Sequence, residues 1–402
     1  MNQAASGHRA AVIAGFSGWF LDAFDFFLVT FCLTAIARDF HKSDAQTALV
    51  IAMTLAFRPV GGFVFGLMAD HYGRRLPLMS NMGFFAAAEI LTGLAPTYTA
   101  LLAVRALFGV VMGGQWGAGV SLAMEKAPAN KRGMLSGLLQ QGYAAGNVAA
   151  AICYFLLYPH VGWRPLFFIG SAPAILLVLF IQYQVQESEV WQENRPRRMN
   201  FVEHSRNIAS HWKLFFYLLF FMTMMLFAAH CTLDLYPTFL QREWHFGPVR
   251  RSAVTAFSAT GAILGGIVVG HLSDRWGRRL TIIAAFTMGT LLIPIWAYAP
   301  NQVLLIAGAF LMQFMVQGAW GVIPAHLAEL SPSSVRAFLP GFAYQSAGSI
   351  ASSAVYIEAA YAQRTSYATA MALMALGVFV FAAVMAALGR ERRGHNLGAA
   401  GP

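Results

Sequence analysis

The sequence predicts an all-α membrane protein whose twelve transmembrane helices form two parallel-related halves of six. Of its 402 residues, 58% are hydrophobic and only 11% are charged, which excludes a water-soluble domain. Apolar runs near or above ~18 residues alternate with short charged loops, as in helices that cross a bilayer. The decapeptide at 66–75 (GLMADHYGRR) returns at 270–279 (GHLSDRWGRR), so one structural unit occurs twice.

Each apolar run predicts one span. In the first half, 1–183, the expected spans lie near 11–37, 47–69, 76–94, 98–124, 133–157 and 163–183. A polar linker at 184–211 separates the halves. In the second half, 212–402, they lie near 212–240, 251–272, 280–299, 301–327, 336–361 and 367–388. We expect the first span to remain in the mature protein rather than be cleaved as a signal peptide.

The basic residues indicate the topology. Most Lys and Arg fall on the side that would hold both termini, including Arg74, Arg75, Arg278 and the linker run 195–198. This excess places both termini and the linker in the cytoplasm of a multi-pass protein, and the short loops suggest a bacterial inner membrane. The net charge of +10 is therefore a topology signal, and no nucleic-acid partner is expected.

Several activities are excluded by missing motifs. The three cysteines lie in apolar runs without CxxC spacing, so no metal site is expected. No nucleophile elbow, phosphate loop or HExxH occurs, which argues against an enzyme and an ATP-driven pump. We expect no cofactor besides a coupling proton. The expected partners of a monomeric chain are a small organic anion, the proton and the lipid bilayer.

The repeat also predicts a symmetry. An offset of six spans returns each copy to the same orientation, so the halves are related about an axis along the membrane normal. A substrate site is then expected between them near the midplane, with alternating access by rocking. The doubled Gly-x-x-x-Asp-x-x-Gly-Arg-Arg loop on a 6+6 frame resembles the major facilitator superfamily, and the resemblance covers essentially the whole chain.

The two loop motifs are candidate gating elements. Asp70 and Asp274 can pair with arginines or face a helix N-terminus, and so latch one closed state. A tight charged turn is the simpler interpretation, but the resemblance favours the latch. The motif residues are Gly66, Asp70, Gly73 and Arg74 in the first half and Gly270, Asp274, Gly277 and Arg278 in the second.

Two acids lie in the first span. Asp22 and Asp25 are three residues apart, so they share a helix face. Asp22 lies roughly 16 Å along the helix, near the centre of a ~30 Å apolar core. Two close carboxylates there cannot both ionise cheaply, so one should hold a proton readily. The alternative is a structural acid paired with a neighbouring helix.

Two arginines also fall inside spans. Arg58 needs an acceptor, which is either Asp22 or Asp25 or a substrate carboxylate, and both interpretations remain open. Arg105 begins Arg-x-x-x-Gly-x-x-x-Gly, which resembles the fourth-helix arginine motif of the superfamily. That resemblance implies a role in proton coupling for Arg105.

The seventh span carries His230 and Asp234 one helical turn apart, so the acid can orient the imidazole and tune its proton affinity. Pro237 then interrupts the helix, as expected where a helix lines a cavity. The segment resembles a signature of fungal lactate permeases in the sialate:proton symporter family. His230, Thr232, Asp234 and Thr238 match it, whereas Leu226, Ala229 and Leu233 depart from it. The first-span acids, Arg58-Pro59 and 113–117 (GGQWG) also look like that family.

Neutral polar side chains in the spans are candidate substrate ligands beside Arg58 and His230, or simply hydrogen bonds between helices. They are Gln115, Gln141, Asn147, Gln313, Gln317, Tyr344 and Gln345. The repeat pairs Gln141 with Gln345, so these two could face each other across the pseudo-axis. Glu89 and Glu358 lie nearer the outer ends of their spans, and we expect them to reach the membrane interface.

Together these features predict a secondary active transporter that couples uptake of a small organic anion to a proton. The proton would compensate the charge of the anion. A lactate-like monocarboxylate is favoured, and sialic acid or an aromatic acid is the alternative substrate. A transporter-like receptor without turnover is the alternative from another class, although paired latch motifs and buried acids argue against it.

Overall fold

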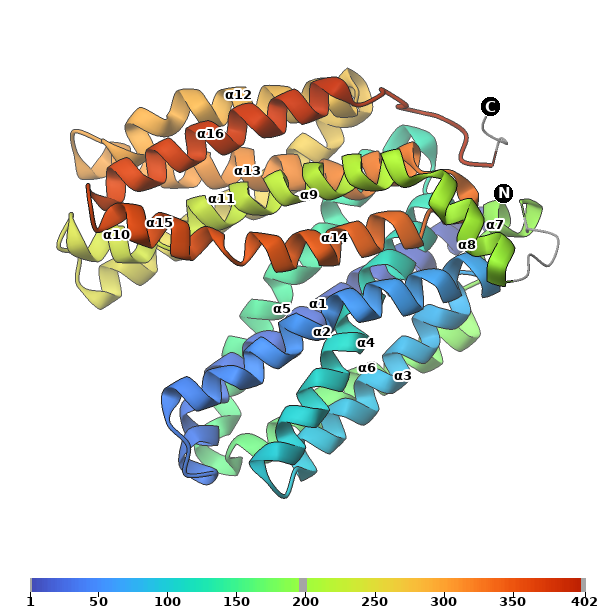
Figure 1. Ribbon diagram of the computed structural model, residues 1–402, viewed down its shortest axis with the longest axis horizontal. Coiled ribbons are helices and arrows are strands. Elements are labelled where there is room, and N and C mark those ends of the chain that lie inside the picture. Colours follow the sequence, from blue (N-terminus) through green and yellow to red (C-terminus); the bar gives the residue numbers. More distant parts are fainter. Residues whose placement is uncertain (1, 195–200, 399–402) are drawn as a thin grey trace.

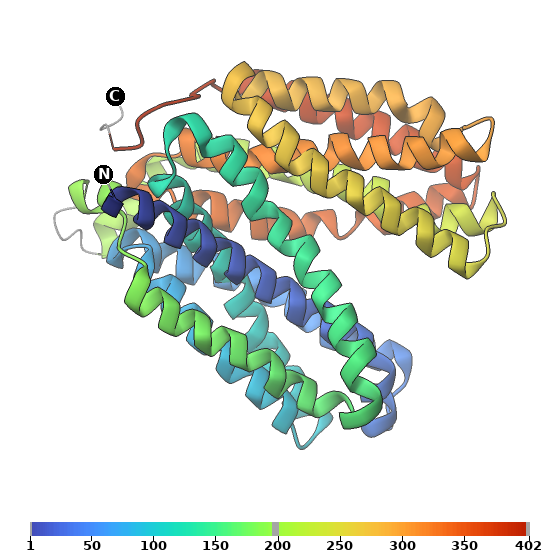
Figure 2. The same cartoon turned by 180° about the vertical axis from the view of Figure 1, so that it is seen from behind.

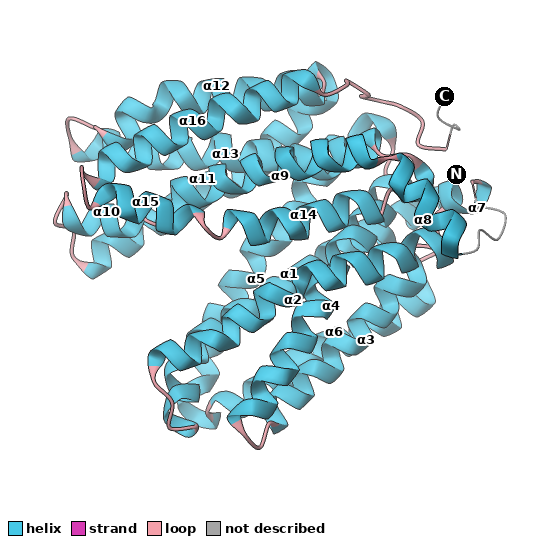
Figure 3. Cartoon of the chain, in the orientation of Figure 1, coloured by secondary structure: helices cyan, strands magenta, loops and turns pink. Residues whose placement is uncertain are grey.

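The computed structural model describes residues 2–194 and 201–398, and within these ranges all regular structure is helical (Figure 3). The first half comprises α1 Asn2–Asp39, α2 Asp44–Tyr72, α3 Arg75–Leu94, α4 Tyr98–Lys126, α5 Arg132–Val161 and α6 Trp163–Gln184. Two short helices follow, α7 Glu189–Glu193 and α8 Phe201–Ser210. The second half comprises α9 Trp212–Leu233, α10 Tyr236–Arg242, α11 Pro248–Trp276, α12 Arg278–Ala297, α13 Gln302–Leu330, α14 Phe338–Ala351, α15 Ala354–Ala362 and α16 Tyr367–Leu388. The basic linker run 195–198 lies outside the described residues.

The twelve-span prediction is confirmed, with one difference. By length and apolarity, ten described segments could cross a membrane; α3 and the pair α14–α15 complete the twelve. The seventh and eleventh spans are each broken into two helices. Pro237 lies in the first turn of α10, where its missing N–H is tolerated, so a new helix begins there. Before α15, the Ser352 and Ser353 hydroxyls bond to backbone carbonyls, which competes with a continuous helix.

The repeat extends to the helix boundaries. The α2 and α11 helices each have 29 residues, as do α4 and α13. Their first and last residues recur at the spacing that separates Asp70 from Asp274. Thr97 caps α4 through its side chain, and Asn301 caps α13 in the same way. The turns after α2 and α11 both need positive φ, 100° at Gly73 and 97° at Gly277, which glycine adopts without strain.

The two halves meet at one end of the molecule. Figure 1 and the reverse view in Figure 2 show their ribbons touching where both termini and α7 lie, and diverging away from that end. We call the end with the termini the terminal side and the opposite end the distal side. Large apolar side chains such as Phe155, Leu176 and Phe381 are exposed, as expected for helices that contact lipid.

Glycines allow the halves to approach closely near the terminal side. A Cβ on Gly137 of α5 would lie 2.1 Å from the carbonyl oxygen of Gly266 in α11. A Cβ on Gly66 of α2 would lie 2.9 Å from the Cα of Phe338 in α14. Side chains larger than hydrogen would therefore push the halves apart at these crossings.

Candidate functional site

The first gating motif joins the two halves at the terminal side. Asp70 pairs with Arg74, with 2.8 Å between Oδ1 and Nη1. The same carboxylate accepts hydrogen bonds from the backbone N–H groups of Ala337 and Phe338, both at 3.0 Å, at the start of α14. Both contacts that the sequence left open, an arginine and a helix N-terminus, are therefore present in one closed arrangement.

The second gating motif repeats this geometry in the opposite direction. Asp274 pairs with Arg278 at 2.8 Å and accepts the N–H groups of Gly133 and Met134 at 2.7 and 3.0 Å. These two residues begin α5 of the first half. Each half thus caps a helix of the other half with a carboxylate.

Four further residues complete these contacts, and sequence reasoning did not place them at the site. Glu125 accepts hydrogen bonds from Arg74 and from Arg336 of the other half, and Glu329 accepts from Arg278 and from Arg132. The signal was present, because both pairs recur at the offset of the gating motifs. We call the latch the set Asp70, Arg74, Glu125, Arg336, Asp274, Arg278, Glu329 and Arg132.

The latch is buried and charged. Burial acts to lower the pKa of Arg74, but the carboxylates of Glu125 and Asp70 outweigh it and raise that pKa above its ordinary value. Arg74 therefore stays charged while the latch is closed. Chain segment 395–397 covers the latch, because Arg132 donates to the carbonyl of His395 and Arg336 donates to that of Leu397.

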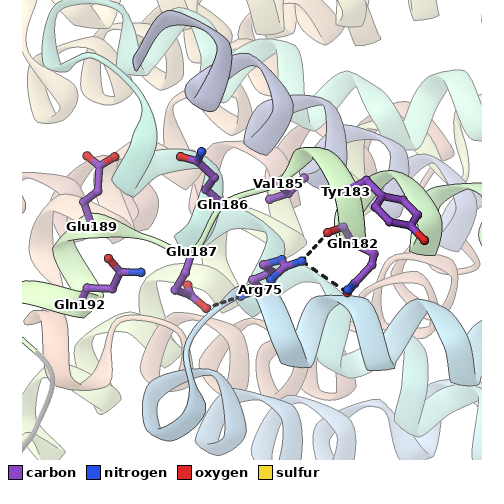
Figure 4. Close-up of a pocket in the computed structure, with 8 residues that line it drawn as sticks. All are labelled: Arg75, Gln182, Tyr183, Val185, Gln186, Glu187, Glu189 and Gln192. Carbon is purple, nitrogen blue, oxygen red and sulfur yellow. Dashed lines mark hydrogen bonds between the residues drawn. The ribbon is translucent and has the colours of Figure 1, made fainter. Parts of the chain in front are cut away.

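A pocket of about 460 Å³ lies beside the latch, on the outside of the first half (Figure 4). Its central contact is a cap on α3: Glu187 accepts the backbone N–H groups of Arg74 and Arg75 at 2.9 and 3.1 Å. Arg75 also donates to Gln182 of α6. In the second half Glu391 accepts the N–H of Arg279 at 2.9 Å. These capping glutamates hold the loop motifs in place and lie away from the acids of the first span.

Inside the membrane region, Asp25 pairs with Arg105 and not with Arg58. The Arg105 guanidinium donates to both oxygens of Asp25 at 3.0 and 2.5 Å, and its Nε donates to Thr54. All three side chains are fully buried. Of the acceptors that the sequence left open for Arg58, Asp25 is therefore excluded, and a separation of three residues rotates Asp22 away from Asp25 by about 60° around the helix.

Asp22 occupies a different environment. It is fully buried, and within the described residues neither carboxylate oxygen has a hydrogen-bond partner. The nearby charged groups are Arg58 and Asp25. Arg58 carries its guanidinium over the Tyr344 ring, 5.9 Å from the centroid, and its Nε is also buried without a partner among the described residues.

These groups converge between the halves. Arg58, Tyr344, Asp234 and Asp22 all act electrostatically on the hydroxyl of Tyr143, although they come from different helices. Asp234 bonds to His230 at 2.8 Å between Oδ2 and Nδ1, at the break between α9 and α10. The His230 and Asp234 side chains are 35% and 31% exposed, so solvent reaches this pair but not Asp22.

Aromatic rings cluster around Tyr344, the ring that lies against the guanidinium of Arg58. Tyr344 lies 4.7 Å from Trp116, 6.1 Å from Trp19 and 6.0 Å from Trp320, measured between ring centroids. Tyr143 lies 5.1 Å from Trp19. We call Trp19, Trp116, Trp320, Tyr143 and Tyr344 the aromatic box. Sequence reasoning identified only Tyr344, although the recurrence of Trp116 as Trp320 was a usable signal.

Most of the candidate glutamines are engaged by the protein. Gln115 donates to the carbonyl of Gly15, and Gln313 donates to Thr232. Gln141 and Gln345 do not face each other, so that expectation is wrong: Gln345 donates to the Gly113 carbonyl of the first half. Gln141 donates to its own helix and lies against Gly266 of the second half. Asn147 and Gln317 are only partly buried.

Glu89 and Glu358 do not reach the membrane interface, so that expectation is also wrong. They are 0% and 1% exposed. In the described part of the chain, none of their carboxylate oxygens has a hydrogen-bond donor. Position along a span did not reveal this, because both side chains point into the helix bundle rather than along the helix axis.

The chain resembles known proteins over nearly its full length. The sequence model of the "Major Facilitator Superfamily" matches residues 15–248 and 235–401. The chain is 31% identical over 406 residues to a "Probable 4-methylmuconolactone transporter" of Cupriavidus pinatubonensis, covering 96% of this chain and 92% of that one. It is 28% identical to the "Carboxylic acid transporter protein homolog" of Saccharomyces cerevisiae, covering 94% and 67%, and to the "Sialic acid transporter NanX" of Escherichia coli, covering 84% and 83%. A solved structure of the proton:xylose symporter XylE superimposes with a TM-score of 0.78 at 16% identity over 98% of each chain.

Proposed function

The chain belongs to the major facilitator superfamily, and on this premise we propose that it is a proton-coupled symporter of a small organic acid. Membership makes it a multi-pass membrane transporter rather than an enzyme. One observation carries the proposal: between the halves, the fully buried Asp22 has no hydrogen-bond donor among the described residues, and it lies near the half-buried Arg58, whose Nε–H has no acceptor among them.

This arrangement suits an anion and a proton together. A substrate carboxylate would accept two parallel hydrogen bonds from the planar guanidinium of Arg58. The negative charge of the ligand would then favour the protonated form of Asp22. Substrate and proton therefore stabilise each other in the site, which is the thermodynamic requirement for symport. His230 and Asp234, which face the same space, would tune the pH dependence of binding.

The latch supports alternating access. It closes the terminal side, whereas the ribbons diverge toward the distal side (Figure 1). Transport requires a second state in which both latch carboxylates release the helix N-termini of the opposite half. Because the basic residues gather on the terminal side, we assign that side to the cytoplasm of a bacterial inner membrane. The present conformation would then face outward.

The site favours a small acid over a sugar acid. Sialic acid carries several hydroxyls, but Gln115, Gln313 and Gln345 are already bonded within the protein. A lactate-like monocarboxylate needs only Arg58, a few donors and an apolar wall. The aromatic box supports a second candidate, a planar unsaturated or aromatic acid that would stack on Tyr344 or Trp116. The similarity to a probable 4-methylmuconolactone transporter agrees with this candidate.

The test uses purified protein in proteoliposomes with a panel of labelled lactate, muconate, benzoate and sialic acid. We expect an inward proton gradient to concentrate one of the first three, and Asp22→Asn to abolish concentration while exchange of internal for external substrate survives in part. Asp25→Asn should behave similarly because its pair with Arg105 is lost. If both variants concentrate substrate like the parent, these acids do not carry the proton. If the parent binds an acid without exchange, the chain is a receptor.

A further inference from the structure

A third acid lies behind the Asp25–Arg105 pair. Glu89 comes from α3, is fully buried, and its carboxyl lies against that of Asp25. On its other side it packs against α6, where a Cβ on Gly170 would lie 2.9 Å from Glu89 Oε2. The proposed substrate site does not use this residue.

The charges that face Glu89 come from two helices. Asp25 of α1 and Arg105 of α4 are the groups that act on it most strongly. From α6 the neighbour is Gly170, which has no charge. Arg105 already directs two nitrogens to Asp25 and one to Thr54, and its face is covered by the Phe108 ring at 4.1 Å. Neither oxygen of Glu89 receives a hydrogen bond from the guanidinium.

The charges and hydrogen-bond donors of Glu89, Asp25 and Arg105 determine which protonation state of the two acids is stable. Two carboxylates and one guanidinium carry a net charge of −1 in a site sealed from water, which is strongly unfavourable. Two ionised carboxylates are both acceptors, so a contact between them has no hydrogen. One proton resolves both problems, because a protonated Glu89 can donate its O–H to Asp25 while Asp25 keeps its ion pair with Arg105.

We propose that Glu89 is the residue that holds the coupling proton in this conformation, donating it in a hydrogen bond to Asp25. This inference rests on the proposed symport function. Transfer of the proton breaks the Glu89 O–H bond and forms an O–H bond on Asp25, leaving Glu89 ionised. Asp25 then loses part of its attraction to Arg105, and Asp22, one helical turn away, provides the route to the space between the halves. The proton-carrying unit is therefore a chain of three acids rather than the two acids of α1.

The experiment compares Glu89→Gln with Glu358→Gln. The second variant removes an equally buried carboxyl of the second half, which also has no hydrogen-bond donor within the described part of the chain. A glutamine at 89 can donate its amide N–H to Asp25 and so imitates the protonated acid permanently. We expect Glu89→Gln to lose concentration of substrate in a proton gradient but to keep exchange. Glu358→Gln should keep both, and because the charged neighbour of Glu358 is Asp234 it should change only the pH dependence of affinity. Glu89→Asp, which retains the acid, should restore coupling with a shifted pH profile.

A second readout does not depend on transport. Infrared difference spectra of the parent in the absence of substrate should contain a protonated-carboxyl signal that Glu89→Gln removes. A Glu89→Gln variant that concentrates substrate like the parent, or retains the signal, overturns the proposal. The proposal is also overturned if Glu89→Gln loses both substrate exchange and substrate concentration although it unfolds at the same temperature as the parent. If the parent itself fails to concentrate any acid, the symport function is wrong, and the infrared signal alone decides whether Glu89 holds a proton.

Discussion

The two halves of the molecule agree at the terminal side and differ inside the membrane. The latch residues of one half are matched by the same residues in the other, with ion pairs of the same length, 2.8 Å. The charged residues inside the first half have apolar counterparts at the same repeat positions. These pairs are Asp22 and Leu226, Asp25 and Ala229, Arg58 and Ala262, Glu89 and Ile293, and Arg105 and Ala309.

The second half has its own distinct features. His230 stands where the first half has Phe26, and the helices α9–α10 and α14–α15 are broken where α1 and α5 are continuous. Closing and opening require both halves, so that machinery is present twice. The proposed proton coupling would need only one set of buried charges, and because their desolvation is costly a second set would be unfavourable. The comparison therefore distinguishes the latch, which both halves share, from the buried charges that we propose for coupling, most of which lie in the first half.

The largest expected effect is that of Arg105→Ala, which gives the first half the alanine that the second half has at the equivalent position, Ala309. Arg105→Ala leaves Asp25 without its cation in a sealed site, which should destabilise the fold by about 3–5 kcal/mol and abolish transport. The double variant Asp25→Ala/Arg105→Ala should recover part of the stability but no coupling. Thermal unfolding in detergent measures this. An Arg105→Ala single variant as stable as the parent would contradict the burial of this pair.

The second-largest effect is expected for Arg58→Lys, on the affinity for the substrate. A lysine is a point charge and cannot form two parallel hydrogen bonds with a carboxylate, so affinity should fall by about 1.5–3 kcal/mol, or roughly 10- to 100-fold. Calorimetry across pH measures it. The control is Arg164→Lys, in a half-exposed pair with Asp39 on the first half, which should bind normally. If Arg58→Lys binds like the parent and Arg105→Lys does not, the carboxylate clamp is Arg105. His230→Ala should chiefly change the pH dependence.

The latch variants test the symmetry itself. Asp70→Asn and Asp274→Asn each weaken charge-assisted bonds to a helix N-terminus of the other half. Each should slow transport by roughly 5-fold, a change of about 1 kcal/mol, with little loss of affinity. Because the two copies have nearly the same geometry, their effects should be similar. A loss of affinity with an unchanged maximal rate, or an effect confined to one half, would show that the latch copies are not equivalent.

The smallest effect is expected at the capping glutamates. Burial acts to raise the pKa of Glu391, but the backbone N–H groups of Arg279, Arg278 and Arg393 outweigh it, so the pKa lies below its ordinary value. A carboxyl whose pKa is lowered on folding stabilises the fold above its unfolded pKa, and this stabilisation is lost as pH falls through the folded value. Glu391→Gln should therefore cost about 0.5–1 kcal/mol near neutral pH and less in acid. Glu187→Gln should cost a similar amount at neutral pH. Denaturation across pH measures both, and a cost at Glu391 that grows in acid would refute the assignment.

The sequence by itself determined the helices, the repeat and the contacts that the motif aspartates make with an arginine and with a helix N-terminus. Apolar length and the recurrence of 66–75 at 270–279 are properties of the chain alone, and the aspartates of both motifs make the two contacts expected of them. The spacing of His230 and Asp234 along one helix also predicted their hydrogen bond. These features depend on local geometry, which sequence separation specifies.

Only the tertiary structure decided which groups meet across helices. It paired Asp25 with Arg105 instead of Arg58, turned Gln141 and Gln345 toward opposite halves, and buried Glu89 beside Asp25. Each of these outcomes depends on how far neighbouring helices rotate and tilt. A rotation of about 60° is enough to move a side chain from one neighbour to the next, and the spacing within one helix does not specify which neighbouring helix lies in each direction.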